Sequence, residues 1–162
     1  MKTIIWIMWW WEKSSSIDLE NSYQIWKFCA KNNFVTLTWW RNVWVMNEWL
    51  KWAKENWWLT LWILPNNDKK SCSEYLDIPI FTNMRSWRNY INALSSDILV
   101  VCWIELWTST EISLWLKAWK NVILIWTYEE ANIFYKKIWL KNIFIAKNYI
   151  EWINFIKQIL WI

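Results

Sequence analysis

The sequence of 162 residues contains no glycine. At the usual proportion of roughly 7%, a globular chain of this length would carry about 11 glycines. Glycine adopts positive φ without a steric penalty, so tight turns and helix ends commonly depend on it. In this chain another residue has to occupy those positions.

Histidine is also absent. Its absence excludes Ser-His-Asp and Cys-His catalysis and any metal site built on histidine. Three cysteines, Cys29, Cys72 and Cys102, are few, odd in number and without a ligand pattern. They argue against a disulfide framework and a zinc site and favour a reducing cytoplasm. We therefore expect a cytoplasmic protein with no resident metal.

Long apolar runs are missing as well. None approaches 18 residues, which excludes a membrane-spanning helix, and the N-terminus lacks the layout of a signal peptide. The 18 basic and 14 acidic residues give a net charge of +4 and form no basic stripe. We expect no membrane partner and no nucleic-acid partner.

Tryptophan, by contrast, occurs 22 times, at places where glycine is usual. Trp9-Trp10-Trp11 follows an apolar strand pattern, Trp39-Trp40 opens a turn, and Trp57-Trp58 follows an asparagine. Trp119 lies between a helical segment and an apolar strand, the usual place for a glycine helix cap. Indole has no reason to prefer such sites. We therefore hypothesise that most or all of the tryptophans stand in for glycine.

Two origins would explain such an exchange. One is deliberate replacement, and the other is translation under the wrong genetic code, because UGA is one base from the glycine codon GGA and is read as glycine in some bacterial lineages and as tryptophan in others. The richness in Ile, Lys and Asn fits an AT-rich genome, although ordinary GGN codons should still leave some glycines. The coding DNA at the 22 positions distinguishes these origins.

Short apolar runs alternate with longer amphipathic segments, which predicts βαβ units. The expected strands are Thr3–Met8, Phe34–Leu37, Leu59–Ile63, Ile98–Val101, Val122–Ile125 and Ile143–Ile145. The expected helices are Ile17–Lys31, capped by Ser16, and Val43–Glu55, Met84–Ser95, Thr108–Ala118, Glu129–Ile138 and Tyr149–Leu160. The fold class is α/β: a single-domain, Rossmann-like, doubly wound parallel sheet over residues 1–162, with helices on both faces.

In such a sheet, ligands bind beyond the carboxyl ends of the strands. The functional loops should be Trp9–Ser15, Thr38–Asn42, Pro65–Ser73 and Cys102–Trp107. Read with glycines, Thr38–Met46 becomes T-G-G-R-N-V-G-V-M, a turn that lets backbone N–H groups approach a phosphate. A tight turn that needs glycine for geometry alone is an equal alternative. The expected ligand-binding residues in the first two loops are Trp9, Trp10, Trp39, Trp40, Arg41 and Trp44.

A second candidate site spans Cys102–Glu111 and opens a helix. Thr108 and Glu111 have the spacing of a capping box, and the spacing alone favours that structural role. The functional alternative is a second anion cradle at Trp107 and Thr108, with Glu111 aimed into the cleft.

A third candidate site is Arg85–Asn89, at another helix start. Arginine there opposes the helix dipole, which raises the expectation of a ligand role above chance. A solvated surface arginine is the open alternative.

With glycines restored, the chain resembles a Rossmann-type family that includes the LONELY GUY cytokinin-activating phosphoribohydrolases, proteins labelled "possible lysine decarboxylase" and molybdenum-cofactor carrier proteins. The resemblance covers nearly the whole chain. Thr38–Met46 followed by Glu48–Glu55 is similar to the family's G-G-x-x-G-V-M…G-A-K-E, and Leu61–Pro65 to its G-I-L-P. Arg88-Asn89 matches its R-N helix start, and Trp107–Glu111 its G-T-x-x-E. The short carrier-like branch is the most similar.

The resemblance implies catalytic roles for Arg88 and Glu111 if the protein is a phosphoribohydrolase that cleaves the N-glycosidic bond of a nucleoside 5′-monophosphate. The hydrolase P-G-G, however, is replaced by Cys102–Leu106, where Glu105 would repel a phosphate. We therefore expect a carrier-like, homo-oligomeric protein that binds a phosphorylated small molecule, either a nucleotide or the molybdenum cofactor. A form with tryptophan at glycine positions could be inactive, because indole would fill the space meant for phosphate.

Overall fold

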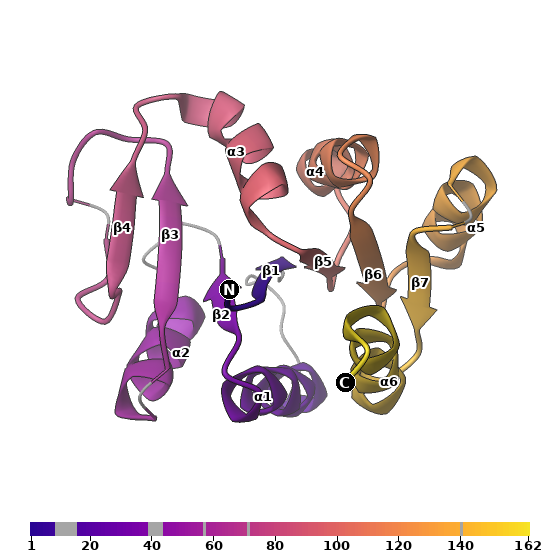
Figure 1. Cartoon of the computed structure of the whole chain (residues 1–162), viewed down its shortest axis with the longest axis horizontal. Coiled ribbons are helices and arrows are strands. Elements are labelled where there is room, and N and C mark those ends of the chain that lie inside the picture. The colour runs from indigo at the N-terminus through magenta and orange to yellow at the C-terminus, as the bar shows by residue number, and fades with distance from the viewer. Residues whose placement is uncertain (9–15, 39–43, 57, 71, 140) are drawn as a thin grey trace.

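A computed structural model describes residues 1–8, 16–38, 44–56, 58–70, 72–139 and 141–162, with only the backbone given at 16–19, 21, 22 and 44–49. Within them, seven parallel strands form one sheet in the order β4-β3-β2-β1-β5-β6-β7 (Figure 1). The strands are β1 (Ile4–Met8), β2 (Val35–Leu37), β3 (Thr60–Leu64), β4 (Ile78–Phe81), β5 (Ile98–Val101), β6 (Asn121–Ile125) and β7 (Ile143–Ala146). The order reverses between β1 and β5, which are paired from Ile5↔Ile98 to Met8↔Val101.

Helices cover both faces of this sheet. They are α1 (Ser16–Lys31), α2 (Trp44–Glu55), α3 (Arg88–Ser95), α4 (Leu106–Lys117), α5 (Glu129–Ile138) and α6 (Tyr149–Leu160), with a short 3₁₀ helix, η1 (Arg85–Trp87), before α3. Figure 1 shows α1, α2 and α6 on one face and α3, α4 and α5 on the other. The predicted α/β fold with a doubly wound parallel sheet is confirmed.

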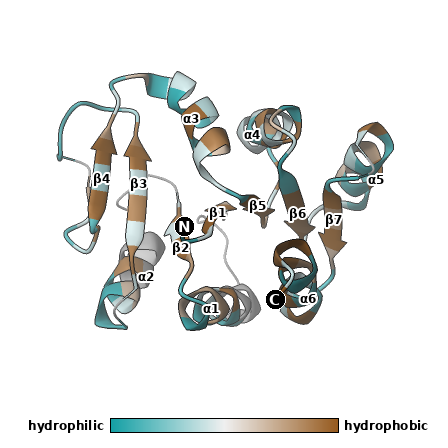
Figure 2. Ribbon diagram, viewed as in Figure 1, coloured by the Kyte–Doolittle hydropathy of each residue, from teal (hydrophilic) through white to brown (hydrophobic). Residues whose placement is uncertain are grey.

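The central strands are buried on both faces because successive side chains point to opposite sides of a strand. Ile5, Ile7, Ile98 and Val100 belong to a cluster that also holds Ile25 of α1, Ala53 of α2 and Trp152 of α6. Trp6, Met8, Leu99 and Val101 belong to a second cluster, with Ala93 of α3, Ile112 of α4 and Tyr135 of α5. Hydrophobic residues accordingly run along the strands in Figure 2, as two-sided burial of a parallel sheet requires.

Six strands and six helices lie within a few residues of the predicted limits. The strand β4 was not predicted, since it contains Pro79. It pairs with β3 at one edge of the sheet, where a strand tolerates the missing N–H of proline. The helix α1 begins at Ser16 itself, and α4 begins two residues earlier than predicted. No helix within the described ranges is both long and apolar enough to cross a membrane.

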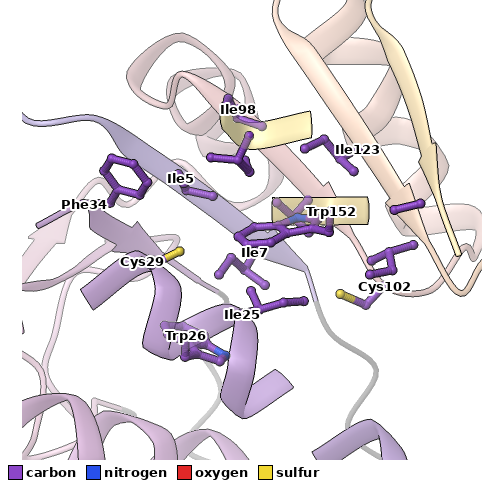
Figure 3. Close-up of a cluster of buried hydrophobic side chains, with 14 of the residues drawn as sticks. Ile5, Ile7, Ile25, Trp26, Cys29, Phe34, Ile98, Cys102, Ile123 and Trp152 are labelled. Atoms are coloured by element: carbon purple, nitrogen blue, oxygen red, sulfur yellow. The ribbon is translucent and has the colours of Figure 1, made fainter. Parts of the chain in front are cut away.

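Cys29 lies on α1 inside the first hydrophobic cluster (Figure 3), and its side chain is fully buried. Burial raises the pKa of the Cys29 thiol well above its ordinary value, because the thiolate would lose its hydration there. The native protein therefore keeps this thiol protonated at a pH where the unfolded chain ionises it.

We expect the free energy of unfolding to fall as the pH rises above about 8.5, where the thiol of the unfolded chain ionises. Each further pH unit removes about 1.4 kcal/mol, until the pH reaches the native pKa. Urea denaturation at pH 7 and pH 10, for the unsubstituted chain and for Cys29→Ala, measures this. An equal pH dependence of the two proteins would contradict the prediction.

Candidate functional site

Two helices begin at the carboxyl edge of the sheet and face each other there. The helix α3 follows β4, and α4 follows β5 through the loop 102–105, so both present their N-termini at this edge. The backbone N–H of Cys102 donates to Met8 O (2.9 Å), which extends the pairing of β1 with β5 past the strand ends. The edge between β1 and β5 is where the strand order reverses, the usual ligand position in such sheets.

Arg88, the first residue of α3, has only 1% of its surface exposed. Its Nη1 donates to the side-chain oxygen of the adjacent Asn89. Burial lowers the pKa of the Arg88 guanidinium, and the negative charge of Glu111 raises it in part. An arginine that has given up its hydration needs such a partner, because an unpaired buried charge is strongly unfavourable.

Glu111 of α4 provides this partner, and its side chain is 0% exposed. It interacts electrostatically with Arg88 across the interface between α3 and α4. The two residues that the resemblance singles out are therefore brought together, although 23 positions separate them in the sequence. Both side chains are buried, and this buried pair of opposite charges interacts electrostatically.

Thr108 and Glu111 do not form the capping box that their spacing favoured. The helix α4 already begins at Leu106, and its N-cap residue is Glu105, which has extended backbone and makes no side-chain capping bond. Thr108 therefore lies within the first turn and is buried, together with Glu111 and Ile112 on the inward side of the helix. The preference for a structural cap is wrong, because the chain enters the helix before it reaches Thr108.

Asn92, one turn after Arg88 on the same side of α3, was not predicted as a site residue. Asn92 is fully buried, and neither its Nδ2 nor its Oδ1 makes a hydrogen bond in the described part of the chain. The Nε of Arg88 also lacks one. Buried polar atoms of this kind normally bind water or a ligand when no protein group pairs with them. The signal was visible in the sequence as polar residues at 88, 89 and 92, where an amphipathic helix should turn an apolar face inward.

The other predicted ligand-binding residues are placed only in part. Trp107 is 40% exposed in the first turn of α4, beside buried Thr108. Trp44 begins α2, and its side chain is not described. The remaining five residues lie outside the described ranges; they are Trp9, Trp10, Trp39, Trp40 and Arg41.

Arg85, from the third candidate site, lies apart from the buried pair. It is exposed, and its backbone N–H donates to Pro65 O (3.1 Å), just beyond the carboxyl end of β3. Its φ of 48° is in the left-handed region, which is uncommon for arginine. The segment Arg85–Asn89 is thus a helix start, as predicted, with one arginine facing solvent and the other facing inward. Across the ranges that the structure covers, no three His, Cys, Asp or Glu side chains gather into a metal site.

Comparison with known proteins agrees with this architecture. The model of the SLOG cluster4 family matches residues 2–152, which is nearly the whole chain. The chain belongs to this family. The predicted resemblance to the LONELY GUY and molybdenum-cofactor carrier group is thereby confirmed, and no protein among the curated ones matches the chain.

Two solved structures share the fold of this chain. The molybdenum cofactor binding protein from the phototrophic bacterium Rippkaea orientalis is 35% identical, with a TM-score of 0.85 over 99% of this chain and 98% of its own. The molybdenum cofactor carrier protein from Chlamydomonas reinhardtii is 33% identical, with a TM-score of 0.85 over 99% of this chain and 100% of its own. This SLOG cluster4 chain therefore matches both relatives from end to end.

Because Arg88 and Glu111 interact in the interior, we expect their substitutions to have strongly coupled effects on the free energy of unfolding. Arg88→Met alone should lower the free energy of unfolding by about 3–5 kcal/mol, because it leaves the Glu111 carboxylate buried without its cation. Adding Glu111→Leu should recover most of that loss, since an apolar pair replaces two desolvated charges. Urea denaturation of the four members of the cycle measures the coupling.

Arg85→Gln is the matched control, since it removes an exposed arginine three residues earlier. It should change the free energy of unfolding by no more than about 0.5 kcal/mol. If the double variant were as unstable as the sum of the single variants, the two side chains would not form a pair.

Proposed function

We propose that this protein binds a phosphorylated nucleotide-type or pterin ligand, such as the molybdenum cofactor, at the carboxyl edge of its sheet and carries it unchanged. The observation that supports this most directly is the match to two proteins named for binding or carrying the molybdenum cofactor, at 35% and 33% identity over nearly all of each chain. Such identity over the full length favours a related ligand class.

The first turn of α4 is the part of the site suited to phosphate. Its N-cap, Glu105, supplies no side-chain acceptor, so the first N–H groups of the helix are not capped by that residue. Helix N-termini bind anions through these N–H groups and through the helix dipole. Thr108 in the same turn adds a hydroxyl. A phosphate on the cofactor would be held by these groups, and the cofactor itself would supply the metal and the dithiolene chemistry when bound.

The buried pair favours a carrier over a hydrolase. A glycosidic hydrolase needs a carboxylate that reaches the substrate, whereas Glu111 is fully buried and interacts electrostatically with Arg88. In a carrier the same pair would hold α3 and α4 in a fixed position relative to each other. The N-termini of these helices, which face the ligand, would then be held in place as well. Asn92, whose amide donor and acceptor are both unused, suits a bridging water buried between these helices.

Nucleoside 5′-monophosphate phosphoribohydrolase remains the second candidate function, because the R-N and G-T-x-x-E patterns are retained at Arg88 and Glu111. Incubation with AMP or a cytokinin monophosphate decides between the two. Stabilisation without turnover supports the carrier, and release of free base with ribose 5-phosphate supports the enzyme. If Glu111→Ala left an observed turnover unchanged, Glu111 would not be catalytic.

We also propose a single domain, a cytoplasmic location and a homo-oligomeric state for this protein. Residues 1–162 form a single domain, which the one continuous sheet supports. The protein acts in the cytoplasm. It also assembles into a homo-oligomer, for which the exposed apolar side chains of Leu94 on α3 and Leu106 on α4 are suitable contacts. Light scattering on the purified protein measures the oligomer.

We expect substitutions at Glu105 and Thr108 to change the affinity for a phosphorylated ligand in opposite directions. Glu105→Gln removes an exposed negative charge at the start of α4 and should tighten binding of a phosphorylated ligand, most clearly at low salt. Thr108→Val removes the hydroxyl at nearly constant volume and should weaken binding by roughly 2- to 10-fold. Isothermal titration with AMP and with a phosphorylated pterin measures both.

Glu129→Gln serves as the charge control, because it removes a carboxylate from the first turn of another helix, α5. It should leave the affinity unchanged. Equal effects of Glu105→Gln and Glu129→Gln would place the phosphate away from α4.

A further inference from the structure

Three tryptophans have left-handed backbone conformations. The φ angles are 60° at Trp119, 56° at Trp126 and 58° at Trp161. A side chain at such an angle brings Cβ close to the backbone carbonyl, which is unfavourable for every residue except glycine and is tolerated best by asparagine and aspartate. A bulky aromatic residue in this conformation is a genuine outlier, and here it recurs three times.

The hydrogen bonds show that the backbone requires this conformation at Trp119. The N–H of Trp119 donates to Leu116 O (3.0 Å), and the N–H of Lys120 donates to Trp115 O (3.0 Å). These two bonds define a Schellman motif, with Trp119 at the position that is usually glycine. At the end of α6, Ile162 N donates to Lys157 O (3.1 Å) in the same way, with Trp161 left-handed.

The end of α1 provides an internal comparison. Asn33 N donates to Ala30 O (2.9 Å), and Phe34 N donates to Cys29 O (3.1 Å), so the same motif ends this helix. Here the left-handed residue is asparagine, with φ of 58°. Asparagine, which tolerates positive φ, therefore ends one helix, and tryptophan ends two others. All three helix ends require the same left-handed backbone conformation.

A second and independent observation concerns tryptophans in the core. Trp6 in β1, Trp62 in β3 and Trp152 in α6 are fully buried, and the indole N–H of each makes no hydrogen bond to the described residues. Indole N–H groups almost always find an acceptor when buried. Trp58 and Trp115 do so, with Phe34 O (2.6 Å) and Ser96 Oγ (2.9 Å). Each of the three core positions thus buries an indole N–H that no described residue accepts.

We propose that the functional protein carries glycine at the tryptophan positions, beginning with these six. Asparagine satisfies the left-handed positions but would leave an amide unpaired in the core. Alanine satisfies the core but not the left-handed positions. If one residue type stands at all six positions, glycine alone meets both requirements, because it has neither a Cβ nor a polar side chain. The proposal concerns the identity of the residues and does not depend on the proposed ligand.

Glycine would also change the carboxyl edge of the sheet. At Trp107, glycine would open the first turn of α4 beside Thr108, where indole now occupies the surface. Glycine lets a ligand approach the backbone N–H groups closely. The glycine form should therefore offer a phosphate more room at this turn than the tryptophan form does.

Paired substitutions test the backbone requirement. Trp119→Gly and Trp119→Ala both remove the indole, so they differ only in whether Cβ is present in the left-handed conformation. We expect the unfolding constant of Trp119→Gly to be roughly 5- to 30-fold lower than that of Trp119→Ala, with the same order at Trp161. Urea denaturation measures it.

Trp115, in the interior of α4, is the matched control. There the order should reverse, with Trp115→Gly unfolding roughly fivefold more readily than Trp115→Ala, because glycine is unfavourable inside a helix. If alanine equalled or exceeded glycine at both Trp119 and Trp161, the proposal would be overturned for those positions. Should the tryptophan form not fold, the same pairs are compared in a chain with glycine at the other tryptophan positions.

The protein made by the cells that naturally encode it provides the decisive measurement. Its intact mass should correspond to glycine at the 22 positions, and it should lack indole absorption and fluorescence, leaving only its six tyrosines and six phenylalanines. A mass that corresponds to tryptophan would refute the proposal. Neither measurement uses a ligand, so a failure of ligand binding would count against the proposed function and leave this inference intact.

Discussion

Burial of the parallel sheet on both faces is the constraint on which the rest of this structure depends. Alternate side chains of β1 and β5 enter opposite hydrophobic clusters, so helices have to cover each face. Right-handed crossovers then deliver the start of each helix to the carboxyl edge of the sheet. The site is a consequence of this arrangement, because α3 and α4 begin at that edge on the same face.

A buried charge pair joins those two helix starts. Arg88 and Glu111 are both removed from water, and the negative charge of Glu111 offsets part of the desolvation of Arg88. A pair so enclosed is suited to holding two elements in a fixed relation. This is the physical reason for preferring a carrier, in which the N-termini of the helices bind, over an enzyme in which the carboxylate itself must reach a substrate.

Much of the fold could be predicted because it follows from local patterns. Continuous apolar runs predicted β5 and β6, and amphipathic runs predicted α5 and α6 to the residue. The edge strand β4 was not predicted, since a partly exposed strand with a proline does not form a continuous buried apolar run. Of the site, Arg88 and Glu111 were found through motif resemblance, whereas Asn92 was missed, because nothing in one helix shows which polar residue a second helix will bury.

The sequence by itself determined the alternation of strands and helices, the family and the anomaly of tryptophan without glycine, all of which are properties of spacing and composition. Only the tertiary structure decided that Thr108 lies inside α4, since the start of a helix depends on how the preceding strand ends. Only the backbone revealed left-handed φ at Trp119, Trp126 and Trp161. The sequence gives the identity of each residue, but its backbone conformation depends on the helices and strands that pack around it.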